Sequence, residues 1–561
     1  MSTRPGLPWL LLSYVPFDFI IAGGGTAGCV VASRLSEDKR FNVLLIEAGP
    51  DDTGILDLMV PGGKPGGNNL TGLLWTYMSE PTPGLNGRSV IVPRGHVLGG
   101  SSSINGMVYT RGSSDDYDKW AELSGDRRWS WKALWPYILR HERWGPPVGG
   151  RNATGEYDPK VHGYSGKVST SLPWDGPVEH DLRTVKNAEL QKEFPITLDV
   201  NAGRPMGVSW MQSTIGNGER SSASTAYLTP EVRERPNLTI LVNTYITRVL
   251  PVRTTGHVPD IRTVEVAPRT GGETRTLTAS RELILTAGVI GTPQIFLNSG
   301  IGNKTELSAL AIPCVLDIPD VGMGLTEHTA ANLAWTITPR PTNPIAQDVA
   351  WAMWTANRTG PYSAAFTHQM LWARLPVNSQ ALKDFGDPSA GPRSPHLEMP
   401  LDSARSAYLV LLTPYSRGSV KIRSKDPFDG PVIDLNVFSH PFDIAAIKEG
   451  IRLAKRFYSG AAWDGYISSF NGPDPDSLSE AEFRTRVTQN ALTFYHPVGT
   501  AKMSPKNAKH GVVDPELRLK GASGLRIIDS SVFPHIPTAH TQAPVYILAE
   551  RGVDFIRDSW H

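Results

Sequence analysis

Apolar positions near the start of the chain predict two neighbouring buried strands. The first covers residues 17–22 and the second covers residues 41–46, and each is apolar at all but one position. Between them, apolar residues recur with helical spacing up to Leu35, directly after a glycine-rich segment. A strand, a glycine turn, a helix and a second strand in this order predict the first βαβ unit of a parallel sheet.

The glycine-rich segment, residues 23–28, has the spacing G-x-G-x-x-G. In such a turn Gly23 permits the sharp bend, Gly25 lets a pyrophosphate approach the backbone, and Gly28 lets the helix pack on the strand. The anion then meets the free N–H groups of the helix N-terminus. The second strand ends on Glu47, which is placed to accept hydrogen bonds from ribose hydroxyls. A merely flexible glycine loop would not need these flanking elements, so the pattern predicts a dinucleotide site.

Later patterns predict a second structural unit. Strands are expected at residues 238–250 and 281–285, the latter followed by a small-residue turn at 286–293 that faces the dinucleotide site. From about 331 to 494, alternating segments such as 408–412 favour a mainly antiparallel sheet. The expected fold class is therefore α/β plus α+β, with a Rossmann-type domain interleaved with a domain built on an antiparallel sheet.

Composition limits the class of protein. The chain has 561 residues, too many for one hydrophobic core, so we expect two domains. The net charge of +1 and the 19% content of charged residues argue against a nucleic-acid partner. The apolar run at residues 8–12 is too short for a membrane span. The two cysteines, Cys29 and Cys314, provide neither a disulfide framework nor metal-ligand spacing, and we expect no metal site.

Sites for N-glycosylation bear on where the protein works. Five Asn-x-Ser/Thr sequons favour a secreted glycoprotein, which we expect to be a monomer acting on a small molecule. The sequons begin at Asn69, Asn152, Asn237, Asn303 and Asn357.

Three ordered segments carry a resemblance to a known family. Residues 93–107 read Pro-Arg-Gly-His-Val-Leu-Gly-Gly-Ser-Ser-Ser-Ile-Asn-Gly-Met, which resembles the first signature of the glucose-methanol-choline oxidoreductases. Residues 281–302 look like the second signature. Residues 495–503, followed by matching short segments up to 542, resemble the family's catalytic region. The resemblance covers about residues 17–556, essentially the whole chain.

This resemblance implies FAD as the cofactor. It implies an FAD-binding domain at residues 15–115, 210–330 and 497–561, and a substrate-binding domain at residues 116–209 and 331–496 that caps the flavin. The FAD-binding residues implied by the resemblance are Gly23, Gly25, Thr26, Ala27, Glu47, Val97, Gly100, Asn105, Gly106, Met107, Val108, Ile246, Asp529, Ser530, Thr541 and Gln542.

Departures from the family pattern are informative. Some relatives attach FAD covalently through a histidine at the position of Ile104, so we expect non-covalent FAD here, with His96 as the only nearby histidine. The segment 321–328 resembles the family's Val-Gly-x-Asn-Leu-x-Asp-His, with Gly324 and Glu327 in place of Asn and Asp.

Two histidines in the catalytic region carry the expected chemistry. His496 is the candidate base, because a neutral imidazole can take a hydroxyl proton and return it within one turnover. The flavin N5 is the implied hydride acceptor. His540 is expected to hydrogen-bond the substrate oxygen and stabilise its developing negative charge.

Residues before His496 suggest a substrate class. Glucose-oxidising relatives carry Arg and Asn where this chain has Leu492 and Phe494, and Tyr495 lies beside the base. An apolar, aromatic pocket of Phe494 and Tyr495 favours a benzylic or furanic primary alcohol, with oxygen or a quinone as electron acceptor. Two alternatives stay open: a pyranose or oligosaccharide dehydrogenase, and a hydroxynitrile lyase in which FAD has no redox role.

Overall fold

The computed structural model describes residues 16–173, 176–269, 271–338, 344–365, 367–401 and 407–560. The apolar run at residues 8–12 and the expected domain ends at 15 and 561 lie outside these ranges. In the described parts, no helix combines the length and the apolar character that crossing a bilayer requires.

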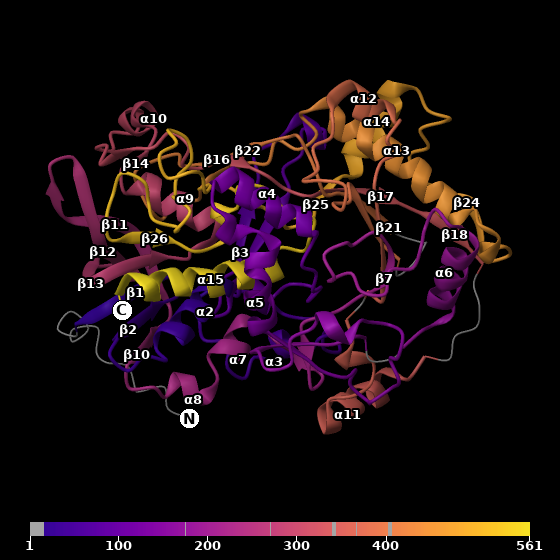
Figure 1. The fold of residues 1–561 in the computed structure, drawn as a ribbon, viewed down its shortest axis with the longest axis horizontal. Coiled ribbons are helices and arrows are strands. Elements are labelled where there is room, and N and C mark those ends of the chain that lie inside the picture. Colours follow the sequence, from indigo (N-terminus) through magenta and orange to yellow (C-terminus); the bar gives the residue numbers. More distant parts are fainter. Residues whose placement is uncertain are drawn as a thin grey trace.

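A seven-stranded sheet carries the predicted βαβ unit. Strands β1 (Phe17–Ala22) and β2 (Val43–Ile46) pair in parallel and are almost wholly buried, as their apolar runs predict. The sheet lies on the left in Figure 1. Its order is β10 (Leu238–Leu241), β2, β1, β13 (Arg275–Leu285), β12 (Val258–Pro268) and β11 (Thr244–Thr255), with β26 (Leu525–Ile527) also on β13.

Two sequence expectations about this sheet are wrong in detail. Residues 238–250 form two strands, because Asn243 adopts a left-handed backbone (φ 54°) that breaks the run between β10 and β11. β10 pairs in parallel with β2, whereas β11 pairs antiparallel with β12. The expected turn at 286–293 is short, since helix α9 (Gly288–Asn298) already begins at Gly288.

Helices α2 (Thr26–Leu35) and α15 (Gln542–Trp560) lie side by side against the first sheet (Figure 1). They share one hydrophobic core with its central strands. Helix α5 (Trp131–His141) packs on α15 from the outside. The first βαβ unit and the last described helix are therefore joined in one unit.

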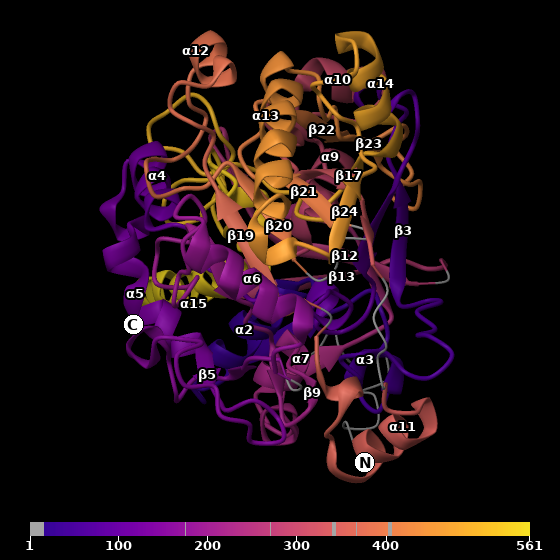
Figure 2. The same ribbon diagram turned by 90° about the vertical axis from the view of Figure 1, so that its right-hand side faces the viewer.

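The second sheet has six strands, all paired antiparallel, as the alternating pattern predicts. Figure 2 shows α13 (Pro441–Tyr458) lying over its strands β20 and β21, with which it shares a second core. The strand order is β25 (Leu492–Thr493), β17 (Thr329–Leu333), β21 (Ala407–Leu411), β20 (Leu397–Pro400), β19 (Gln369–Ala373) and β7 (Gly207–Trp210). Together the two sheets form the expected α/β plus α+β fold.

Smaller elements link the two sheets. A three-stranded sheet joins β16 (Met323–Leu325) to β22 (Gly418–Lys421) and β23 (Val432–Asp434). It therefore crosses the domain boundary expected at 330/331, and the proposed division of the chain stays a prediction. Other elements visible in the figures are α4 (Ser114–Ser124), α6 (Glu179–Leu190), α11 (Gln347–Asn357), α14 (Glu480–Asn490) and β3 (Leu74–Met78). Strand β4 (Ile91–Gly95) pairs with β3.

Candidate active site

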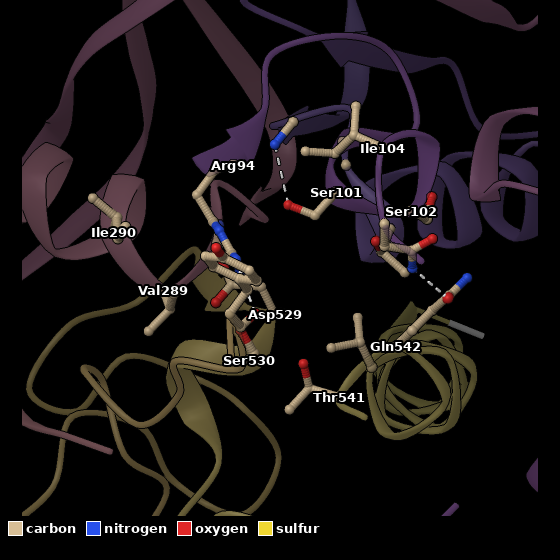
Figure 3. Close-up of a pocket in the computed structure, with 18 of the residues that line it drawn as sticks. Arg94, Ser101, Ser102, Ile104, Val289, Ile290, Asp529, Ser530, Thr541 and Gln542 are labelled. Atoms are coloured by element: carbon tan, nitrogen blue, oxygen red, sulfur yellow. Dashed lines mark hydrogen bonds between the residues drawn. The ribbon is translucent and has the colours of Figure 1, made fainter. Parts of the chain in front are cut away.

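A cavity of about 690 Å³ lies where the two sheets meet. Figure 3 shows part of its wall, with Asp529 and Ser530 on one side and Thr541 and Gln542 at the start of α15. The cavity brings together all but one of the residues expected to bind cofactor or substrate. These are Gly23, Gly25, Thr26, Ala27, Glu47, Gly100, Asn105, Gly106, Met107, Val108, Ile246, Phe494, Tyr495, His496, Asp529, Ser530, His540, Thr541 and Gln542.

Val97 is the exception. Its side chain is fully buried in a small apolar cluster with Leu58 and Leu73 rather than facing the cavity. Its carbonyl accepts a hydrogen bond from Gly100 N. Val97 therefore lies behind the turn that faces the cavity and stabilises that turn through its backbone carbonyl.

Two glycine turns meet at the end of the cavity nearest β1. Gly23 has φ 122°, and a Cβ there would lie 2.4 Å from the carbonyl oxygen of Thr286. Gly100 has φ 56°, and a Cβ there would lie 2.7 Å from Gly25 Cα. Only glycine fits at these positions. Helix α2 begins here with no side-chain cap, so its first N–H groups remain available to a pyrophosphate.

Glu47 lines the cavity beside this turn. Its carboxylate accepts hydrogen bonds from Gly24 N and Gly49 N, both at 2.8 Å. Burial raises the pKa of Glu47 to about 7, against the lowering effect of those hydrogen bonds. The two contacts fix the direction of the carboxylate, which suits an acceptor for ribose hydroxyls.

Asp529 joins two chain segments at the cavity wall. Its carboxylate accepts hydrogen bonds from Gly288 N (2.9 Å), Thr292 Oγ1 (2.7 Å) and Ser531 N (2.8 Å). Burial raises the pKa of Asp529. This residue thereby holds the start of α9 against the segment that carries Ser530.

Asn105 connects the first signature to the last helix. Its Nδ2 donates to Gln542 Oε1 at 2.6 Å. Its Oδ1 accepts from Met107 N and from Arg220 Nη1. Arg220 is buried, donates otherwise to backbone oxygens such as that of Leu58, and pairs with no carboxylate among the described residues. Burial lowers the pKa of Arg220 to about 10, and its guanidinium holds the Asn105 turn from behind the cavity wall.

The two expected catalytic histidines lie together at the opposite part of the cavity. The ring centroids of His496 and His540 are 4.6 Å apart. His540 Nε2 donates to Glu398 Oε1 at 2.9 Å, and Trp372 Nε1 donates to the other oxygen at 3.0 Å. The carboxylate behind His540 therefore orients its ring.

His496 is held from the opposite side by Glu327 and His328. Glu327 Oε1 accepts from His496 N at 2.8 Å, and the Nδ1 atoms of His328 and His496 are 3.0 Å apart. Burial, followed by the charge of His540, lowers the pKa of His496 well below its ordinary value. The imidazole is therefore neutral at neutral pH and able to accept a proton.

Aromatic and apolar side chains form the wall near these histidines. The ring centroid of Phe494 lies 5.4 Å from that of His496 and 5.7 Å from that of His540, with Tyr408 on its far side. Tyr495 also lines the cavity but is 47% exposed, and its backbone has φ 64°. Leu492 does not line the cavity and packs on a small apolar cluster instead.

Some residues of the site escaped the sequence analysis. Glu398 lies in β20, whose residues are all buried, and an acidic residue in such a strand was the signal available. Arg94, within the first signature, reaches the cavity and donates to the Tyr495 carbonyl at 2.8 Å. Tyr408 and Met370 come from strands of the second sheet and carried no local motif.

Ile104 and His96 are the two residues considered above for a covalent bond to FAD, and neither presents a nucleophilic atom to the cavity. Ile104 lines the cavity with an aliphatic side chain. His96 is buried outside the lining, with its ring 4.1 Å from that of Trp75 and its Nδ1 3.3 Å from the Gly72 carbonyl. In the ranges that the structure describes, no group of His, Cys, Asp and Glu side chains could hold a metal ion.

A Rossmann-type sheet with a glycine turn, an acid on the second strand and a cavity that ends at two histidines defines a dinucleotide-binding oxidoreductase. Family models described as GMC oxidoreductase match residues 17–330 and 414–549. The chain belongs to the GMC oxidoreductase family and is an FAD-dependent alcohol oxidoreductase.

Several relatives resemble the chain over nearly its whole length. It is 39% identical to pyranose dehydrogenase 3 of Leucoagaricus meleagris, over 98% of this chain and 94% of that protein. It is also 39% identical to dehydrogenase eriK of Hericium erinaceus, over 97% of this chain and 94% of that protein.

Solved structures share the fold. An FAD-dependent oxidoreductase from Chaetomium thermophilum superimposes with a TM-score of 0.88 at 30% identity, covering 97% of this chain and 99% of that one. A fungal aryl-alcohol oxidase superimposes with a TM-score of 0.88 at 26% identity, with the same coverage.

Proposed function

We propose that the protein oxidises a primary alcohol with an aryl group, benzylic or furanic, to the aldehyde. The observation that carries this proposal is the position of Phe494, whose ring lies within 6 Å of both His496 and His540. A flat ring packed on Phe494 would bring its carbinol group to the two histidines.

His496 and His540 would have different roles toward the hydroxyl group of the substrate. His496, neutral because of burial, takes the hydroxyl proton of the alcohol. His540, whose ring is oriented by Glu398 behind it, would hydrogen-bond the substrate oxygen as negative charge develops there. FAD, held by the Gly23 turn and Glu47, supplies the acceptor for the hydride that leaves the carbinol carbon.

The composition of the cavity wall supports an aryl substrate. The described residues that the second sheet and its flanks contribute are Thr367, Met370, Pro400 and Tyr408. Only two of these carry a hydroxyl, whereas a sugar brings several hydroxyls that would lose their water without gaining partners.

Pyranose oxidation is the second candidate, and one observation favours it. The 39% identity to pyranose dehydrogenase 3 exceeds the 26% identity to the aryl-alcohol oxidase. On this alternative the hydroxyl of Tyr408, which lines the cavity, would bind a sugar hydroxyl.

Anaerobic mixing with single substrates separates these functions. Rapid bleaching of the flavin by a benzylic alcohol, at least tenfold faster than by a pyranose, is the expected result. Faster bleaching by a pyranose would replace the aryl proposal. An unbleached flavin with cleavage of a cyanohydrin would establish the lyase alternative. Reoxidation of the reduced protein by oxygen and by a quinone then identifies the electron acceptor.

We also propose that the protein is secreted as a glycosylated monomer with non-covalent FAD. Asn69, Asn152 and Asn357 are exposed, which suits glycan attachment. Asn237 is buried and its Nδ2 donates to three backbone carbonyls, so we expect no glycan there. Mass spectrometry of tryptic glycopeptides tests this distribution, and a glycan on Asn237 would contradict it.

A further inference from the structure

His328 and His496 make a direct contact between imidazole nitrogens. The two Nδ1 atoms are 3.0 Å apart, and the rings meet edge to face at 86°. His328 is fully buried directly before β17, whereas His496 faces the cavity. At this separation one nitrogen must carry a proton and the other a lone pair.

We propose that His328 is a positioning residue: it accepts a hydrogen bond from His496 Nδ1–H and so leaves the lone pair of His496 on Nε2. The proposal rests on the function of His496 as the base. The opposite arrangement, with the proton on His328 Nδ1, would put the proton of a neutral His496 on Nε2. His496 could then accept no proton from a substrate in the cavity.

The surroundings of His328 keep its ring neutral, which an acceptor role requires. Burial, followed by the charge of His540, lowers the pKa of His328 to about 3, so this ring carries a single proton. With that single proton on Nε2, which has no hydrogen-bond partner among the described residues, Nδ1 is free to accept from His496.

Glu327 fixes the backbone of His496, in addition to the contact that His328 makes with its ring. Its carboxylate accepts from the backbone N–H of His496, while His328 binds the ring. Burial raises the pKa of Glu327 to about 7, and the side chain of Thr493 acts against that shift. The charged and titratable groups that face His496 are His328, His540, Arg94 and Glu327. The dipeptide 327–328 thus fixes both the position and the tautomer of the base.

No described residue hydrogen-bonds His496 Nε2, which is therefore available to substrate. In the proposed reaction, the alcohol O–H proton would move to His496 Nε2 as the carbonyl double bond forms, and bound FAD would supply the acceptor for the hydride of the carbinol carbon. The Nδ1–H bond to His328 persists throughout and stabilises the positive ring.

Two variants at position 328 test this assignment by kinetics. His328→Asn keeps an oxygen acceptor near the place of Nδ1, whereas His328→Phe keeps bulk and removes the acceptor. We expect His328→Phe to slow flavin reduction by about 10²–10⁴-fold, as loss of the correct tautomer does elsewhere, with little change in KM. We expect flavin reduction in His328→Asn to be at least tenfold faster than in His328→Phe. Bound FAD and the melting temperature serve as folding controls. Equal rates and pH profiles for His328→Phe and the unmodified protein would overturn the inference.

A spectroscopic measurement is independent of turnover. In protein labelled with ¹⁵N-histidine, the signals of His496 are assigned by their loss in His496→Gln. We expect its Nε2 to be unprotonated and its Nδ1 to be protonated at neutral pH. The reverse pattern would overturn the inference even if the variants fail to fold. If no alcohol reduces the flavin but this pattern is found, the proposed function fails and the tautomer assignment stands.

Discussion

Glu398 on the second sheet and His540, just before the last helix, are joined by a 2.9 Å hydrogen bond behind the cavity wall. Because the other oxygen of Glu398 is bound to Trp372, the carboxylate cannot turn away from the histidine. The substrate-binding sheet therefore orients a histidine that belongs to the cofactor side of the site.

The charge of this carboxylate can be tested with Glu398→Gln, which keeps the shape and removes the charge. We expect flavin reduction to slow by about ten- to a hundredfold, because a hydrogen bond to a charged group contributes about 1.5–3 kcal/mol. Stopped-flow absorbance measures the rate. Trp372→Phe is the matched control, because it removes only the hydrogen bond from Trp372 to Glu398. It should slow flavin reduction less than Glu398→Gln does. Unchanged reduction in Glu398→Gln would assign the pair a purely structural role.

Removal of the base should have a larger effect. We expect His496→Ala to lower the rate of flavin reduction by about 10²–10⁴-fold while FAD stays bound. Since the base acts in the transition state, kcat and kcat/KM should fall together. His257→Ala, at an exposed position, is the control. Near-normal reduction in His496→Ala would show that another group takes the proton.

The flavin should be dissociable. Ile104 provides no nitrogen to bond the ring, and His96 lies outside the cavity lining. Acid precipitation of the purified yellow protein should therefore release its flavin into the supernatant. Flavin that stays in the pellet would indicate a covalent bond and direct a peptide-mapping search to the residues around it.

Phe494 should decide the preference for aryl substrates. We expect Phe494→Ala to lower kcat/KM for a benzylic alcohol by about tenfold or more and to affect a pyranose less, because the ring loses its packing surface. Tyr495→Ala should have a smaller effect, since that side chain is 47% exposed. Direct competition between the two substrates gives the ratio of their kcat/KM values. A larger loss for the pyranose would support sugar oxidation instead.

A buried ion network predicts loss of stability at alkaline pH. His162 donates to Asp199 (2.8 Å) and contacts Glu142 (3.1 Å), which also pairs with Arg111. Burial lowers the pKa of His162, but its hydrogen bonds to Asp199 and Glu142 outweigh burial and raise it above its ordinary value. A raised pKa in the folded state stabilises the protein at low pH, and this stabilisation disappears as pH rises through that pKa.

The melting temperature should therefore fall as pH rises above about 6.5, the ordinary pKa of histidine. In His162→Gln, which cannot become charged, this part of the pH dependence should vanish. A variant that retains the full dependence would place its origin in another group.

Local sequence determined the first βαβ unit of the cofactor half of the site. The apolar runs of β1 and β2, the glycines between them and Glu47 are close in sequence and carry their own signature, although the close fit at Gly23 also depends on Thr286, which is distant in the chain. The same holds for the antiparallel sheet, because alternation along each strand reflects which face is buried. Its strand order, with β7 beside β19, has no local signature.

The catalytic half depended on tertiary structure. Glu398 and His540, like His328 and His496, are far apart in the chain and meet only because the two sheets pack against each other. A motif can name His496 and His540, but it cannot show which nitrogen of each ring is bonded. That depends on buried partners contributed by other strands, because only there does exclusion of water make a single carboxylate or imidazole decide where the proton sits.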